Sequence, residues 1–128
     1  MKAILDTHAF LWWITDSSRL SARARDLLGN GDNQIFFSAA CGWEIAVKCG
    51  LGKLTLPNPP DKFIPEHLRA NALLALPIEL YHALYVYKLP LHHRDPFDRM
   101  LVTQGILERM PIVTRDEKFD LYDVETIW

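Results

Sequence analysis

The stretch Ala3-Ile4-Leu5-Asp6-Thr7-His8 contains a short apolar run that ends in an aspartate. Consecutive apolar residues that stop at a polar residue are typical of a buried strand at the start of an α/β fold. The residues from Ala9 to Ile14 then predict a short helix rich in aromatic side chains. We therefore expect a strand followed at once by a helix, with Asp6 at the junction.

The rest of the chain continues this alternation. Further strands are expected at residues 34–37, 73–76, 112–114 and 124–127. Further helices are expected at about residues 22–28, 39–49, 61–71, 77–87 and 96–109, and Pro65 is expected to interrupt or shorten the one at 61–71. Strands alternating with helices imply a mostly parallel sheet with helices on both faces. The sequence thus predicts an α/β protein with four to five strands, folded as a single domain over residues 1–128.

The composition is that of a folded globular protein, with 49% hydrophobic and 23% charged residues among 128. The two cysteines, Cys41 and Cys49, lie eight residues apart on a predicted helix. This spacing corresponds to about 12 Å of helical rise, which is too long for a disulfide. It also lacks a Cys-x-x-Cys pattern. We expect both cysteines to be reduced thiols.

The sequence shows no targeting segment, because only three apolar residues precede Asp6. No apolar run approaches the ~20 residues that span a bilayer. We therefore expect a cytoplasmic protein that does not enter a membrane. The net charge of −2 gives no broad attraction to nucleic acid. Any RNA binding must rely on local basic groups and on metal ions that offset nearby acids.

Four acidic residues fall where an α/β fold places its ligands, beyond the carboxyl ends of the strands. Asp6 ends the first strand, and Asp116 lies shortly after the strand at 112–114. Asp98 is in the first turn of a predicted helix, and Glu44 lies on the helix that follows the second strand. These four side chains from separate segments are expected to converge on one edge of the sheet.

Each acid also has a structural alternative. Asp6 can cap the helix that follows it, and Asp116 can be a turn residue. Glu44 has Lys48 four residues further on, in the favourable orientation for a helical ion pair. Asp98 can complete a pair like a capping box with Asp95, three residues earlier, or interact favourably with the helix dipole from the first turn. Only the joint pattern favours a common site.

Clustered carboxylates repel one another unless a cation neutralises them. Ligand sets made of oxygen alone suit Mg²⁺ or Mn²⁺. Such ions can activate water and stabilise an in-line displacement at phosphorus. Thr7 and Thr114 flank the expected pocket and could orient a metal-bound water, or simply satisfy the backbone.

Four motifs carry a family resemblance: Leu5–Ala9, Ser38–Ile45, His93–Leu101 and Thr114–Asp116. The order and spacing of these motifs resemble those of the PIN-domain ribonucleases, and the resemblance covers essentially the whole chain. It is particularly similar to the VapC-type toxins of type II toxin–antitoxin modules. The third motif, HRDPFDRML, is the most specific.

The resemblance implies a PIN-like domain whose four acids are Asp6, Glu44, Asp98 and Asp116. It implies an endoribonuclease dependent on Mg²⁺ or Mn²⁺ that hydrolyses RNA phosphodiester bonds. It also implies a homodimer and a small antitoxin protein that covers the active site. Asp95 is interpreted as the cap of the helix at Pro96, with help to the metal as the alternative.

Basic residues beside the acids are candidate contacts to the RNA backbone. The predicted substrate-binding residues are Thr7, Arg94, Arg99, Thr114 and Arg115, with His92, His93 and Lys118 also nearby. A zinc site is disfavoured because adjacent histidines lack the usual ligand spacing. The aromatic patch of Phe10, Trp12 and Trp13 is interpreted mainly as core. Part of it could instead line a groove for an antitoxin helix or stack an unpaired base.

Other classes fit less well. Haloacid-dehalogenase-type phosphatases need a second aspartate two residues after the first, where this chain has His8. Phosphoacceptor receiver domains need two adjacent early acids and a late strand-end lysine, and neither is found. A non-catalytic PIN-like module that binds RNA or protein stays as an alternative, as does an RNA-processing nuclease that is not a toxin.

Overall fold

The computed structural model describes all residues from Met1 to Trp128, arranged around one sheet with the strand order β3-β2-β1-β4-β5. All neighbouring strands are parallel. The strands are β1 (Lys2–Leu5), β2 (Gln34–Ser38), β3 (Leu74–Leu76), β4 (Ile112–Val113) and β5 (Thr126–Ile127). Strand β1 is central because it pairs with both β2 and β4. All five predicted strands and their parallel arrangement are confirmed.

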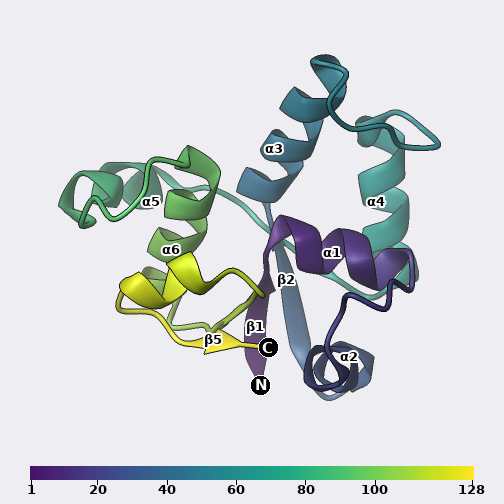
Figure 1. Cartoon of the computed structure of the whole chain (residues 1–128), viewed down its shortest axis with the longest axis horizontal. Helices are drawn as coiled ribbons and strands as arrows, with labels where there is room; N and C mark the ends of the chain where they lie inside the picture. Colours follow the sequence, from purple (N-terminus) through teal and green to yellow (C-terminus); the bar gives the residue numbers. More distant parts are fainter.

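Helices lie on both sides of the central strands, as Figure 1 shows. Helices α1, α2 and α4 lie on one side of β1 and β2, and helices α5 and α6 on the other. The helices are α1 (Thr7–Ile14), α2 (Ala22–Gly29), α3 (Ala39–Gly50), α4 (Pro60–Ala70), α5 (Leu80–Tyr85) and α6 (Pro96–Glu108). Two 3₁₀ helices, η1 (Val86–Lys88) and η2 (Glu117–Leu121), complete the fold. The α/β fold class is therefore confirmed.

The core forms where the helices pack on the sheet. Ala3, Ile4 and Leu5 of β1 are fully buried because helices cover both faces of this strand. Phe10 packs against Phe37 with their ring centres 4.4 Å apart. The aromatic patch is thus partly core, as predicted, while Trp12 and Trp13 remain half-buried. None of the helices is both long enough and apolar enough to pass through a bilayer.

Helix α5 is shorter than the predicted segment 77–87. It begins after Glu79, whose backbone N–H donates to Nδ1 of His82 at 2.9 Å in a capping box. The preceding Pro77 is part of a connection, and its carbonyl accepts from the Gln104 side chain at 3.1 Å. The last residues of the predicted helix form η1 instead. The cap therefore sets the start of α5, which periodicity alone did not locate.

Two other helical features differ from the prediction. Helix α4 continues through Pro65. Because proline has no backbone N–H, the helix lacks one hydrogen bond at this position. Phe63 and Ile64, which directly precede Pro65, are buried and pack against the core. The segment η2 was not predicted, and it begins directly after Asp116.

Polar residues at the carboxyl edge of the sheet cap the helices that begin there. Asp6 caps α1, Ser38 caps α3, Asp95 caps α6 and Asp116 caps η2. In each case a side-chain oxygen accepts a hydrogen bond from a backbone N–H of the first turn, as an N-cap does. This shared edge is where the functional residues gather.

Candidate functional site

A cavity of about 190 Å³, here called the acidic pocket, lies at the carboxyl edge of the sheet. It contains all four predicted acids together with Asp95. Its lining residues are Asp6, Thr7, His8, Glu44, Lys48, Asp95, Asp98, Asp116, Lys118 and Phe119. Five carboxylates and two lysines therefore share one small space.

Asp6 forms the floor of this pocket and is only 6% exposed. Its Oδ1 accepts from the backbone N–H of Ala9 at 2.7 Å, and its Oδ2 accepts from the Thr114 hydroxyl at 2.6 Å. Burial raises the pKa of Asp6, while the bonds to Thr114 and Ala9 oppose this increase. Asp6 is thus both the cap of α1 and a member of the pocket, because its two oxygens serve different partners.

Glu44 projects from α3 into the same space and is 7% exposed. Its Oε1 accepts from the Thr7 hydroxyl at 2.6 Å, and its Oε2 pairs with the Lys48 ammonium at 2.5 Å. The bond to Glu44 raises the pKa of Lys48. The helical ion pair anticipated as an alternative for Glu44 is present, and it lies at the edge of the pocket, where the Glu44 side chain is buried and that of Lys48 is 42% exposed.

Asp98 shows how strongly the acids influence one another. Its side chain is 21% exposed on the first turn of α6. Burial raises the pKa of this carboxyl from 3.8 to about 7, and the charges of Asp95, Glu44, Asp116 and Asp6 add to the increase. All the other acids of the pocket therefore act on Asp98, which makes this a site of concentrated negative charge.

Asp95 and Asp116 each use one oxygen as a helix cap. Oδ1 of Asp95 accepts from the backbone N–H groups of Phe97 and Asp98 at 2.9 and 3.0 Å. Oδ1 of Asp116 accepts from the backbone N–H of Lys118 at 2.9 Å. In both residues Oδ2 makes no hydrogen bond to the protein. Asp95 therefore caps α6, as predicted, whereas Asp116, considered as a turn residue, caps the unpredicted η2; each keeps one oxygen for a ligand.

The donor set of the acidic pocket suits Mg²⁺ or Mn²⁺, because it consists of carboxylates without cysteine. As folded, however, the chain has no group of three or more His, Cys, Asp or Glu side chains arranged to hold one ion together. The carboxylates share a cavity without converging on a point. Side-chain rotation toward a cation would thus have to accompany binding, and the free oxygens of Asp95 and Asp116 permit it.

The predicted substrate contacts divide into three groups: two buried threonines, two exposed arginines, and the buried Arg99. Thr7 and Thr114 are buried, and their hydroxyls donate to Glu44 and Asp6. These threonines therefore position carboxylates, and neither is open to a substrate. Arg94 and Arg115 are exposed, and Arg115 lies at the edge of the acidic residues.

Arg99 differs from its predicted role. It is 9% exposed, and its guanidinium donates to the carbonyl oxygens of Pro90, Leu89 and Val86 at 2.8, 3.3 and 3.4 Å. It also donates to the Tyr122 hydroxyl at 3.3 Å. These partners occupy the guanidinium, so Arg99 holds the loop before α6 in place and is not free to contact a substrate.

His93 was grouped with the surface basic residues but lies half-buried behind Asp98. Its Nδ1 lies 2.7 Å from the Tyr122 hydroxyl. Its buried Nε2 has no hydrogen-bond partner and lies 3.4 Å from Oδ2 of Asp98. A small movement of Asp98 would complete this bond, so His93 can hold Asp98 in position. Apart from the nearness of the two residues along the chain, nothing in the sequence indicated this contact.

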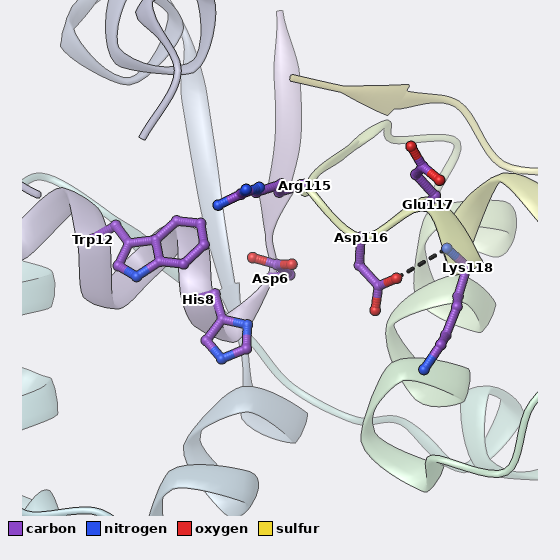
Figure 2. Close-up of a pocket in the computed structure, with 7 residues that line it drawn as sticks. All are labelled: Asp6, His8, Trp12, Arg115, Asp116, Glu117 and Lys118. Carbon is purple, nitrogen blue, oxygen red and sulfur yellow. Dashed lines mark hydrogen bonds between the residues drawn. The ribbon is translucent and has the colours of Figure 1, made fainter. Parts of the chain in front are cut away.

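A second cavity of about 490 Å³, here called the side pocket, opens directly beside the acidic pocket. Figure 2 shows its lining residues, with Asp6 between the α1 side chains and the residues that follow β4. The lining residues are Asp6, His8, Trp12, Arg115, Asp116, Glu117 and Lys118. Asp6, His8, Asp116 and Lys118 line both cavities, so the two form a continuous surface.

A parallel α/β sheet with carboxylates clustered at its carboxyl edge is the class of architecture that the fold and site define. A more specific assignment comes from known families. The family model described as "PIN domain" matches residues 3–125. The chain therefore belongs to the PIN domain family.

Among curated proteins, the chain is similar to Ribonuclease VapC16 of Mycobacterium tuberculosis (strain ATCC 25618 / H37Rv). The two are 34% identical over 71 residues, which is 52% of this chain. The match spans only 50% of that relative's length.

Solved structures share the fold along nearly the whole chain. VapBC2 from Rickettsia felis, bound to a DNA fragment from its promoter, matches with a TM-score of 0.71 and 17% identity, covering 99% of this chain and 98% of that one. FitAcB from Neisseria gonorrhoeae matches with a TM-score of 0.61 and 16% identity, covering 100% and 97%. FitAB bound to an IR36 DNA fragment matches with a TM-score of 0.66 and 17% identity, covering 99% and 94%. At these identities the likeness shows a common fold.

Proposed function

We propose that this protein is a divalent-metal-dependent endoribonuclease and the toxin of a toxin–antitoxin pair. The observation that carries the proposal is the acidic pocket, where five carboxylates gather and the pKa of Asp98 rises to about 7. Such crowding of like charges is unfavourable unless a cation offsets it. The membership in the PIN family supports the same chemistry.

Asp6, Glu44, Asp98 and Asp116 are the residues that would hold Mg²⁺ or Mn²⁺. When bound, such an ion supplies an activated water and stabilises charge in a displacement at phosphorus. The chain itself supplies position: Thr114 fixes Asp6, and Thr7 with Lys48 fixes Glu44. Lys118 lies at the edge of the pocket, where an ammonium can attract the RNA phosphate.

The proposed partners follow from the resemblance and from the relatives. The similarity to a protein named Ribonuclease VapC16 supports RNA as the substrate. The neighbours named VapBC2 and FitAB support a second, antitoxin chain that covers the site. We further propose a homodimer, as the VapC-type resemblance implies.

Expression in a bacterial host tests this proposal. We expect the chain alone to arrest growth, and a small reading frame next to its own gene to relieve the arrest. Because the arrest would come from RNA hydrolysis, sequencing of RNA ends should show new internal cleavage sites within minutes of induction. Asp6→Asn, expressed to the same level, is the matched control and should produce neither effect. Normal growth at full expression, or arrest without new RNA ends, would contradict the proposal.

A further inference from the structure

The side pocket has an aromatic wall formed by Trp12 and His8. These residues lie one turn apart on α1, and their rings stack with centres 5.4 Å apart and an angle of 12° between planes. The Trp128 ring supports Trp12 from the C-terminal end in an edge contact at 5.9 Å. His8 is exposed and Trp12 is half-buried. The wall is therefore a fixed π-surface that remains open to a ligand.

Two cations, Arg115 and Lys118, also line the side pocket, together with the acid Glu117. The Arg115 guanidinium lies 6.0 Å from the centre of the Trp12 ring, and Lys118 extends from the start of η2. Neither cation takes part in an ion pair. Figure 2 shows Asp6 between the aromatic wall and Lys118, while the Arg115 side chain extends toward Trp12. The cations are thus free for an anionic ligand that approaches the acids.

We propose that the side pocket binds one unpaired nucleobase of the RNA, stacked on Trp12 and His8. Arg115 and Lys118 contact the phosphates on either side of that nucleotide. The neighbouring phosphate then lies over Asp6 and Asp116, where cleavage is proposed to occur. This inference rests on the proposed ribonuclease function and adds a subsite that selects single-stranded RNA.

The combination of groups favours a nucleotide over a peptide. Every base has a π-face that stacks on aromatic side chains without regard to sequence. Phosphates need cations, and they also accept metal ions held by carboxylates. An acidic peptide would meet Asp6 and Asp116, and a basic one would meet Arg115 and Lys118. Only a ligand with an uncharged ring and an anionic backbone suits both sides.

Labelled RNA hexamers of each base test the subsite, together with hexamers of the same phosphate charge that contain abasic positions. Fluorescence anisotropy in chelator and in Ca²⁺ measures their affinity without requiring cleavage. We expect the wild-type protein to bind at least one intact hexamer about 5- to 150-fold more tightly than its abasic counterpart, which is the range of one base–aromatic stack. Trp12→Ala should remove this preference, and Trp12→Phe should retain most of it.

Two further variants test the second residue of the aromatic wall and provide a control outside the pocket. His8→Ala alters an exposed ring and should weaken the preference without affecting the fold. Trp43→Ala removes a tryptophan that is 53% exposed on α3 outside the pocket, and should leave the preference unchanged. Equal affinity of the wild-type protein for intact and abasic hexamers would overturn the proposal. So would a Trp12→Ala protein that keeps its base preference but loses a protein partner.

The outcomes separate this proposal from the proposed function. A clear base preference in a protein that cleaves RNA equally well in chelator would contradict only the metal mechanism. Metal-dependent cleavage without any base preference would contradict only the subsite.

Discussion

Asp98→Asn is expected to abolish divalent-metal binding and RNA cleavage, and to raise the melting temperature of the metal-free protein at about pH 8. The substitution removes the one carboxyl on which all the other acids of the pocket act. It preserves the size and shape of the side chain, and the backbone N–H of this residue still bonds to Asp95. Loss of function and gain of stability then have one cause, which is the removal of a crowded charge.

The sign of the stability change follows from the raised pKa. The folded protein holds a proton on Asp98 up to about pH 7, whereas the unfolded chain releases it near 3.8. The metal-free protein therefore loses stability as the pH rises between these values, and the whole loss is present at pH 8. The difference of roughly 3 units corresponds to at most about 4 kcal/mol, and exposure of the side chain to solvent reduces it. We expect a gain of about 5 °C.

Calorimetry in chelator at about pH 5 and pH 8 measures this effect, and Mn²⁺ titration measures binding. Asp26→Asn is the matched control, because Asp26 is exposed on α2 away from the pocket. It should alter neither quantity. An Asp98→Asn protein that melts lower than the wild type at pH 8 would contradict the account of charge crowding.

Asp6→Asn is expected to reduce RNA cleavage by at least about 100-fold while the protein stays folded. Residues that merely support a metal ligand already cost 10- to 100-fold when changed, so the ligand itself should cost more. The asparagine oxygen can still accept from Ala9, which keeps the cap of α1. The amide can donate to the Thr114 hydroxyl once that hydroxyl rotates.

Asp61→Asn provides the comparison for Asp6→Asn, since Asp61 is an exposed acid in the first turn of α4 outside the pocket. Both variants reduce negative charge near a helix start, but only Asp6→Asn should reduce cleavage. Circular dichroism verifies that both remain folded. Cleavage at the wild-type rate by folded Asp6→Asn would exclude Asp6 from the mechanism.

The acids could be predicted from the sequence because their positions depend on local structure. Asp6 follows a strand and Asp98 begins a helix, and parallel strands direct both to one edge. The N-caps at Asp6, Ser38 and Asp95 could be predicted for the same reason, since an N-cap depends on its own side chain and the next few residues. The caps at Glu79 and Asp116 were not predicted.

The surroundings of the acids depend on contacts that the sequence does not reveal. Arg99 was expected beside the substrate because it adjoins Asp98 in sequence, yet consecutive helical residues point about 100° apart. Its partners Pro90, Leu89 and Val86 lie in a loop whose path has no periodic pattern. The inward turn of His93 toward Tyr122 likewise depends on a contact across 29 residues.

The side pocket was also only partly predictable. Trp12 and His8 lie at helical spacing, so their stacking follows from α1 alone. Their nearness to Arg115 and Trp128 requires β4 and β5 to place the C-terminal segment beside α1. The unpredicted η2 carries Lys118 to the same place.

The central claim is that the carboxylates of the acidic pocket bind a divalent metal. The most direct test is the anomalous diffraction of crystals soaked in Mn²⁺. We predict a peak within about 2.0–2.6 Å of carboxylate oxygens of Asp6 and Asp98, with Glu44 or Asp116 rotated toward it. An acidic pocket that stays without a peak in crystals of protein that cleaves RNA in Mn²⁺ would contradict the account.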